Sequence, residues 1–530
     1  MPAIITDQYR ILNAETFVDS FSGIGTNRIN NYYSFLGHPN PKNTDVKNYG
    51  DSGWGNPVPN PIDAFDQENF YYDSMLFLKK VTPNDVRRVV PRLDWQTGTT
   101  YEMYRNNYSS SNRTPQTKST TLYGSQYFVV NSEFNVYLCI NNGSNPDNPN
   151  GQKSLFEPTH TNTVPQEAGN GSDGYLWKYL FTISPSDIVK FVTTTYIPLP
   201  KKWGDTSTKT IKDASVDGKI ETVIIKNGGS GYSIDTSGTV SSTGTISDIP
   251  ITGDGTGGTV SININSGIVE SISGVVGGSG YTYAAVRFES GQFGGKTLIV
   301  GSGAEFEVII PPKGGHGADI YRELGGFRVM LYSKYDNNVD HVPDYVLGND
   351  FSRVGLVKNP LQFGGTDLLN NTTATNLGAL KLQPDTTSGL STSQVTYAPN
   401  DLITQTVGVG STAVGYVASW NPDTGVLRYY QPVGFSTLST YSYKKLDFVG
   451  SGNTSPITGG TSENLVVDGT FSGKTTTIGG KNVDLGQTFN LGKASPEVKK
   501  YSGEIIYIDN RAPVTRTASQ KEEVKIVIEF

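Results

Sequence analysis

The fold class of this chain is decided by the segment Gly171-Ser172-Asp173-Gly174-Tyr175-Leu176-Trp177-Lys178-Tyr179-Leu180-Phe181-Thr182-Ile183. Residues 171–174 are typical of a turn, because glycine adopts positive φ and aspartate bonds to its own backbone. The alternation that follows predicts a strand with one face formed by Tyr175, Trp177, Tyr179, Phe181 and Ile183. Four aromatic side chains on one face must be covered by a core or by another subunit. Ser184 then predicts the N-cap of a short helix that begins at Pro185.

The composition favours a multi-domain β protein. A chain of 530 residues is too long for one core, and its 61 Gly and 28 Pro favour short strands joined by many turns. The net charge is −7 and no Lys/Arg run occurs, which argues against a nucleic-acid surface. We expect no membrane span and no secretory signal, because long apolar runs are absent from the sequence. The single cysteine, Cys139, cannot form an internal disulfide, so we expect a buried thiol and assembly in a reducing cytosol.

Two N-terminal helices are predicted. Residues 6–21 place apolar side chains at helical spacing after Thr6, a candidate N-cap, and residues 66–80 carry an aromatic stripe. Between them lies a Pro/Gly/Asn-rich loop, 39–61. The chain has 30 Tyr, 22 Phe and 5 Trp but only 35% hydrophobic residues, so part of its aromatic content is expected at interfaces. The candidate subunit contacts are Trp54, Tyr71 and Tyr72, which lie in segments that look too exposed for a β core.

An internal repeat occupies residues 213–312. Residues 217–221 and 227–232 match residues 266–270 and 277–281, and the repeated Gly-Ser-Gly-Tyr motif ends at Tyr232 and Tyr281. A second match pairs 253–255 with 301–303, 48 positions apart. Because a solenoid needs about three or more repeats, two units predict a small inserted β module.

These patterns together predict a mainly β, multi-domain fold with antiparallel sandwich-like or barrel-like domains, a few N-terminal helices and inserted Gly-rich β repeats. The expected order is a helical N-terminal arm at 1–80, a first β region at 81–212, the repeat module at 213–312, a return to the core β region at 313–361, a second inserted Thr/Ser/Gly-rich β region at 362–500, and C-terminal strands at 501–530.

No motif predicts catalysis, a cofactor or a metal. Gly473-Lys474-Thr475 and Gly295-Lys296-Thr297 lack the glycine five positions earlier that a phosphate-binding loop requires. His316 has no second histidine or cysteine nearby, and no nucleophile elbow precedes a helix. We therefore expect no enzyme activity, no cofactor and no metal site.

Three collinear segments carry a family resemblance: residues 171–203, 349–361 and 501–530. They resemble the baseplate wedge protein known as gene product eight in T-even-like contractile-tailed bacteriophages. The positions that carry the resemblance are Gly174, Tyr175, Trp177, Tyr179, Asn359, Pro360, Gly503, Glu504, Asn510, Arg511 and Pro513. The resemblance implies a non-enzymatic structural subunit of the virion, located in the tail baseplate and assembled in the host cytoplasm. It also implies that the chain pairs with itself, as a homodimer, and with neighbouring wedge proteins. The 213–312 and 362–500 regions lie outside the resemblance.

Two alternatives remain at this point. A tail-fibre or receptor-binding module would use aromatic side chains on the repeat loops, Tyr232 and Tyr281, to stack on glycans. A polysaccharide-degrading enzyme is the third reading. A glycan-binding screen and a hydrolase assay separate these readings.

Overall fold

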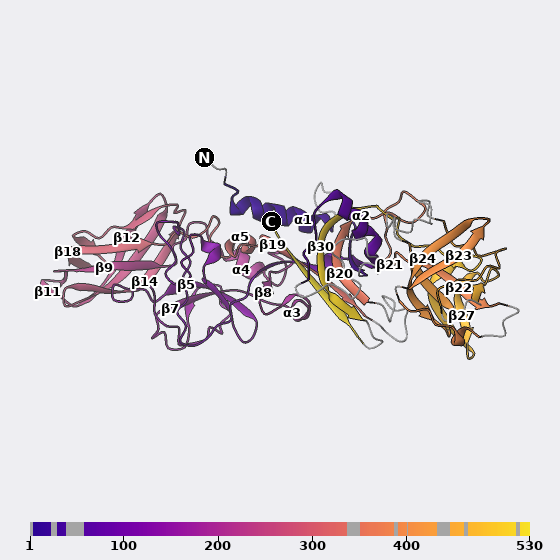
Figure 1. The fold of residues 1–530 in the computed structure, drawn as a ribbon. Helices are drawn as coiled ribbons and strands as arrows, with labels where there is room; N and C mark the ends of the chain where they lie inside the picture. The colour runs from indigo at the N-terminus through magenta and orange to yellow at the C-terminus, as the bar shows by residue number, and fades with distance from the viewer. Residues whose placement is uncertain are drawn as a thin grey trace. The chain divides into compact units, whose positions relative to one another are not determined.

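The computed structural model describes residues 4–22, 29–38, 58–336, 350–385, 391–399, 401–431, 446–460, 465–515 and 520–530. The fold is mainly β with a few helices, and antiparallel pairing predominates, as the sequence predicted (Figure 1). The chain divides into two compact units. Unit 1 comprises residues 1–18, 87–330 and 527–530, and unit 2 comprises residues 19–86 and 331–526.

Unit 1 begins with most of α1 (Asp7–Ser20) and contains the predicted strand at 175–183 as β7 (Tyr175–Thr182). The other elements before the repeats are β3 (Val86–Pro91), η2 (Leu122–Gly124), β4 (Phe128–Val130), β5 (Asn135–Asn142), β6 (Gln166–Glu167), α3 (Pro185–Phe191), β8 (Tyr196–Pro198) and α4 (Lys209–Asp213). The sheet order is β4-β5-β7-β6. The predicted cap is confirmed: Ser184 Oγ accepts a hydrogen bond from the Asp187 backbone N–H at the start of α3.

Both faces of β7 are covered. Tyr175, Trp177 and Phe181 are buried, whereas Tyr179 is half-buried. Lys178, on the opposite face from Trp177, is also buried. The pairing of β7 with β5 shifts register twice, between Val136 and Tyr137 and between Cys139 and Asn141, and such bulges turn neighbouring side chains away from strict alternation. The strand therefore lies in the centre of a core instead of at a half-exposed surface.

The repeat region forms sheets of its own. Its strands are β9 (Val223–Ser230), β10 (Ser233–Thr236), β11 (Thr239–Ser241), β12 (Gly244–Gly253), β13 (Thr256–Asn265), β14 (Ile268–Ser279), β15 (Ala284–Val286), β16 (Gly291–Phe293), β17 (Lys296–Ile299) and β18 (Ser302–Val308). They pair in the orders β11-β10-β17-β16, β14-β13-β12-β15 and β18-β9. In Figure 1 these strands gather beside β5 and β7, not among them. Ile224 and Ile309 nevertheless belong to the core around β7.

The two repeats are interlocked. The first strand of each repeat pairs with the last strand of the other: β9 with β18, and β14 with β13. The Gly-rich turns of the two repeats also bond to each other reciprocally. Tyr281 N of the second repeat donates to Gly218 O of the first, and Tyr232 N of the first repeat donates to Gly267 O of the second. This reciprocal pairing has the form of a two-fold dimer within one chain. It explains why two repeats suffice where a solenoid needs more.

The structure corrects the second repeat match. Ser230 pairs with Ser302, and its equivalent Ser279 pairs with Thr256, so Thr256 corresponds to Ser302. Gly257 and Gly303 accordingly share positive φ values of 78° and 83°. The offset in this half is therefore 46 positions and not 48. Matching by glycine alone was wrong because several glycines lie close together, and only strand pairing distinguishes them.

After the repeats, unit 1 contains α5 (Ile320–Glu323), and the chain passes between the units in β3, β19 (Arg328–Tyr335) and β31 (Glu522–Glu529). These strands and β8 form a sheet in the order β31-β19-β3-β8. The predicted C-terminal strands are confirmed as β30 (Glu504–Thr515) and β31.

Unit 2 is built on the sheet β21-β2-β1-β20-β30. Its early elements are β1 (Tyr32–Gly37), α2 (Phe65–Ser74), β2 (Met75–Val81), η1 (Pro83–Asp85) and β20 (Asp350–Lys358). The later elements are β21 (Thr373–Thr375), β22 (Gly378–Pro384), η3 (Thr392–Gln394), β23 (Leu402–Gly408), β24 (Ser411–Asn421), β25 (Val426–Tyr430), β26 (Leu465–Val467), β27 (Gly473–Ile478), β28 (Lys481–Phe489) and β29 (Lys493–Ala494). A second sheet, β23-β24-β25-β22-β26, has its own core, which includes Leu380, Val417 and Ile457.

The predicted helix at 66–80 is wrong in its second half, and residues 1–80 are not a helical arm. The helix α2 ends at Ser74, and Met75 begins β2, which pairs with β1 and β21. The apolar run Met75-Leu76-Phe77-Leu78 suits a strand as well as a helix, so the neighbouring strands decide. The helix predicted at 6–21 is confirmed as α1.

Candidate interaction surface

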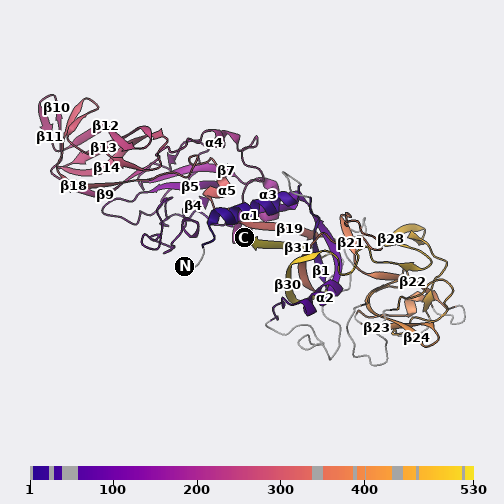
Figure 2. The same cartoon turned by 90° about the horizontal axis from the view of Figure 1, so that it is seen from above.

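The helix α1 is fixed to unit 1 by its inner face. Ile11 and Ala14 are buried, and the Phe17 ring lies 5.4 Å from the Phe530 ring. At its start, Thr6 Oγ1 accepts a hydrogen bond from Tyr9 N, and Asp7 lies in the first turn, where a negative charge stabilises a helix. Figure 2 shows the start of α1 beside the C-terminal residues.

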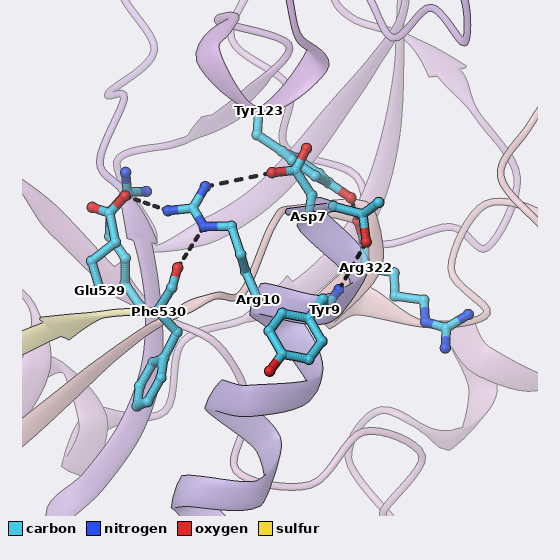
Figure 3. Close-up of polar contacts among 9 residues, drawn as sticks. Asp7, Tyr9, Arg10, Tyr123, Arg322, Glu529 and Phe530 are labelled. Atoms are coloured by element: carbon cyan, nitrogen blue, oxygen red, sulfur yellow. Dashed lines mark hydrogen bonds and ion pairs between the residues drawn. The ribbon is translucent and has the colours of Figure 1, made fainter. Parts of the chain in front are cut away.

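A charged clasp fixes the first turns of α1 (Figure 3). The Arg10 guanidinium donates to the Phe530 main-chain oxygen and to Glu529, and it lies 3.7 Å above the centre of the Phe327 ring. Arg328 Nε donates to the other Glu529 oxygen at 2.8 Å. Burial raises the pKa of Glu529, but the hydrogen bonds and charges of Arg328 and Arg10 outweigh it, so the pKa lies below its ordinary value. The helix is therefore held in one orientation.

The outer face of α1 carries an exposed apolar stripe. Tyr9 and Leu12 are 55% and 56% exposed, and Ile4 and Ile5, which precede the helix, are 86% and 70% exposed. Tyr9 and Leu12 share one helix face, because helical neighbours recur every three or four positions. These exposed apolar side chains make the start of α1 a candidate contact surface. Sequence analysis did not single out these exposed side chains.

The predicted subunit contacts are not placed on a surface. Tyr71 and Tyr72 are 4% and 8% exposed, and Tyr72 belongs to a core cluster with Tyr33 and Val357. The expectation that these two side chains are too exposed for a core is wrong, because the sheet beside α2 covers them. Trp54 lies outside the described residues. Phe65, the first residue of α2, is 93% exposed.

The resemblance positions in unit 1 have structural functions. Gly174 has a φ of 70°, and a Cβ there would lie 2.9 Å from Gly143 Cα. The Tyr175 and Trp177 rings stack 5.3 Å apart in the core. Tyr179, half-buried, shares a hydrogen bond with Thr182.

The resemblance positions in unit 2 lie around β20 and β30, which pair side by side. Asn359 has a φ of 53°, and its side chain accepts from Asn31 N. Gly503 has a φ of 83°, and a Cβ there would approach Lys358 O to 2.7 Å. Asn510 accepts from Arg353 Nε, and Arg353 is fully buried. The remaining positions make local contacts: Pro360 accepts from Leu369 N, Glu504 pairs with Lys358, Arg511 pairs with Asp509, and Pro513 is partly exposed.

The repeat tyrosines cannot stack on glycans. Tyr232 and Tyr281 are 3% and 2% exposed. The Tyr281 hydroxyl accepts from Gly258 N and donates to Ile251 O, and the Tyr232 hydroxyl accepts from Ala304 N. Each tyrosine therefore closes a turn, and the prediction that they grip a ligand is wrong.

Within the described residues, no group of three or more His, Cys, Asp or Glu side chains could hold a metal ion. Cys139 is buried, and burial raises the pKa of its thiol. His316 pairs with Glu323 in the core. Of the helices in the described ranges, none is long and apolar enough to cross a membrane.

Comparison of the sequence with protein-family models finds no match, and a search of curated proteins likewise finds no similar sequence.

Proposed function

We propose that this chain is a non-enzymatic structural subunit of a bacteriophage tail baseplate wedge. The observation that carries the proposal is the position of the segments that resemble that family. Residues 349–361 and 501–515 include β20 and β30, which pair along the central sheet of unit 2, and residues 171–203 include β7 in the core of unit 1. The repeat strands and the β23–β25 sheet, which lie outside the resemblance, pair separately.

At several positions that carry the resemblance, the backbone conformation requires the residue type found there. Gly174 and Gly503 adopt positive φ where a side chain would collide, and Asn359 adopts positive φ while its side chain accepts from the distant Asn31 N. Such positions constrain the framework of a fold and carry no chemistry of their own. They favour a shared framework over a shared active site.

Assembly would use the outer face of α1. We assign its partner as a second copy of the chain, because the exposed Tyr9 and Leu12 face is self-complementary when two helices pack antiparallel about a two-fold axis. The resemblance independently implies a homodimer. Other wedge proteins would then bind the assembled dimer.

The test is sedimentation of the full chain at about 10 µM, a concentration at which contacts of Kd ~1 µM are formed. The double variant Tyr9→Ala/Leu12→Ala should shift the protein from dimer to monomer with unchanged circular dichroism. Val189→Ala is the matched control, because Val189 is 70% exposed on α3 of the same unit. A wild-type chain that stays monomeric and fails to co-purify with any tail protein would contradict the structural role.

A further inference from the structure

A segment of unit 1 that precedes β6, residues 158–165, is bound to β5 and β7 mainly by polar contacts, and we call it the strap. Pro158 is buried, whereas Val164 is 47% exposed and the other strap side chains are exposed or half-buried. A segment that buries so few apolar side chains opens locally at a low free energy. The hydrogen bonds of the strap therefore decide whether it stays closed.

Three side chains outside the strap donate to its main-chain oxygens. These bonds are Asn131 Nδ2 to Pro158 O at 2.9 Å, the Tyr137 hydroxyl to His160 O at 2.8 Å, and Lys178 Nζ to Thr163 O at 3.3 Å. They fix the main chain of the strap at three points. The His160 side chain adds a fourth.

Both nitrogens of the His160 ring are used. Nε2 lies 3.1 Å from Trp177 O, which can only accept, so Nε2 carries a hydrogen. Nδ1 lies 3.3 Å from Asn162 N, which can only donate, so Nδ1 carries none. Only the neutral ring with its hydrogen on Nε2 makes both bonds. A second proton, on Nδ1, would turn the acceptor into a donor that faces the Asn162 N–H, and that bond would break.

The charged groups around the ring do not compensate a positive charge on it. From β5 the ring faces Tyr137, whose ring centre is 5.5 Å away, and from β7 the nearby charge is Lys178, which already pairs with Glu221 at 2.9 Å. On the chain before the strap, the Glu157 carboxylate accepts from a main-chain N–H. No carboxylate among the described residues therefore stabilises a protonated His160.

We propose that the strap is an acid-sensitive latch, in which protonation of the His160 ring opens residues 158–165 and frees the Trp177 carbonyl on β7. Burial lowers the pKa of His160 in the folded chain, and its bond to Trp177 O only partly opposes this. The stability that the neutral ring gives the closed strap is therefore complete above the ordinary pKa of 6.5 and is lost as the pH falls toward the lower folded value. The latch does not depend on the structural role proposed above.

The experiment is hydrogen exchange of the full chain, read by mass spectrometry at about pH 7.5 and about pH 5.5, on either side of the ordinary histidine pKa. Exposure times are scaled to the intrinsic exchange rate at each pH. Both values lie above the ordinary carboxyl pKa values, so carboxylates stay charged. Peptides that cover 158–167, which include the Asn162 N–H, should exchange up to about tenfold faster at the lower pH, because uptake of one proton changes the opening constant by at most tenfold per pH unit. Peptides from β22 to β25 in unit 2 are the reference and should not change.

His160→Gln is the decisive variant, because its amide can donate and accept but cannot titrate. Its strap peptides should exchange at the same scaled rate at both pH values, even if the strap is looser throughout. Thr161→Ala serves as the control, because Thr161 is the exposed next residue of the strap, and it should keep the wild-type response. A wild-type strap that responds no more than the reference peptides, or an equal acid response in His160→Gln, would overturn the proposal.

Discussion

The buried ion pair between Lys178 and Glu221 joins the repeat region to β7, and its removal should weaken unit 1 strongly. The Lys178 Nζ to Glu221 Oε1 distance is 2.9 Å, and the two side chains are 3% and 7% exposed. In Glu221→Ala the ammonium keeps only the Thr163 carbonyl, at 3.3 Å. Breaking a buried pair from one side typically costs about 3–5 kcal/mol, because the remaining charge stays out of water.

The repeat supplies its own control. Glu270 occupies the position of Glu221 in the second repeat but is exposed, with one hydrogen bond from Asn265. Glu270→Ala should therefore change the free energy of unfolding by no more than about 0.5 kcal/mol. The double variant Lys178→Met/Glu221→Leu removes both charges and should recover to within about 1.5 kcal/mol of the wild type.

Hydrogen exchange read by mass spectrometry in increasing urea is the appropriate assay, because a chain of two units need not unfold in one step. Peptides from β7 and β9 report on the region around the pair, and peptides from β22 to β25 report on unit 2 as an internal reference. If Glu221→Ala loses no more protection than Glu270→Ala, the pair is not holding the repeat region in place.

Three further predictions concern the repeat module, the Tyr281 hydroxyl and the Glu529 carboxylate. Replacing residues 213–312 by a short Gly/Ser linker, together with Lys178→Met, should leave the remainder folded in circular dichroism and cooperative on heating, because Gly314 N bonds to the Asp217 side chain and the flanks lie close together. Deleting only 266–312 should instead give aggregates, since β9 loses its partner β18 and β13 loses β14 on one edge. Tyr281→Phe should lower the free energy of unfolding in urea by about 1–3 kcal/mol, because the buried Gly258 N–H loses its acceptor. Tyr283→Phe, at an exposed ring, should leave the free energy of unfolding unchanged. Equal effects of the two variants would contradict this account. The pKa of Glu529 is lowered in the folded chain, so the stability that its carboxylate contributes is complete above its ordinary pKa of 4.5 and is lost as the pH falls through the lower folded value. An acid titration of the free energy of unfolding should therefore show a smaller stability loss in Arg10→Ala than in the wild type.

The sequence by itself determined the features that depend on near neighbours. The strand at 175–182, the Ser184 cap, the helix α1 and the repeat were all readable, because alternation, capping and self-similarity are local patterns. The mainly β class followed from the same patterns. Glycines with positive φ, such as Gly174 and Gly503, also fell in segments that the sequence had already singled out.

Only the tertiary structure decided which of two equally permitted local structures formed and which side chains were covered. Residues 75–81 form a strand because β1 and β21 pair with them on both sides. The stabilisation from these two pairings comes from segments distant in sequence, so local propensity does not predict it. Tyr71, Tyr72, Tyr232 and Tyr281 lost their expected exposure because segments distant in sequence pack over them. The exchange of strands between the repeats and the pairing of Lys178 with Glu221 likewise depend on contacts between distant residues, which periodicity cannot encode.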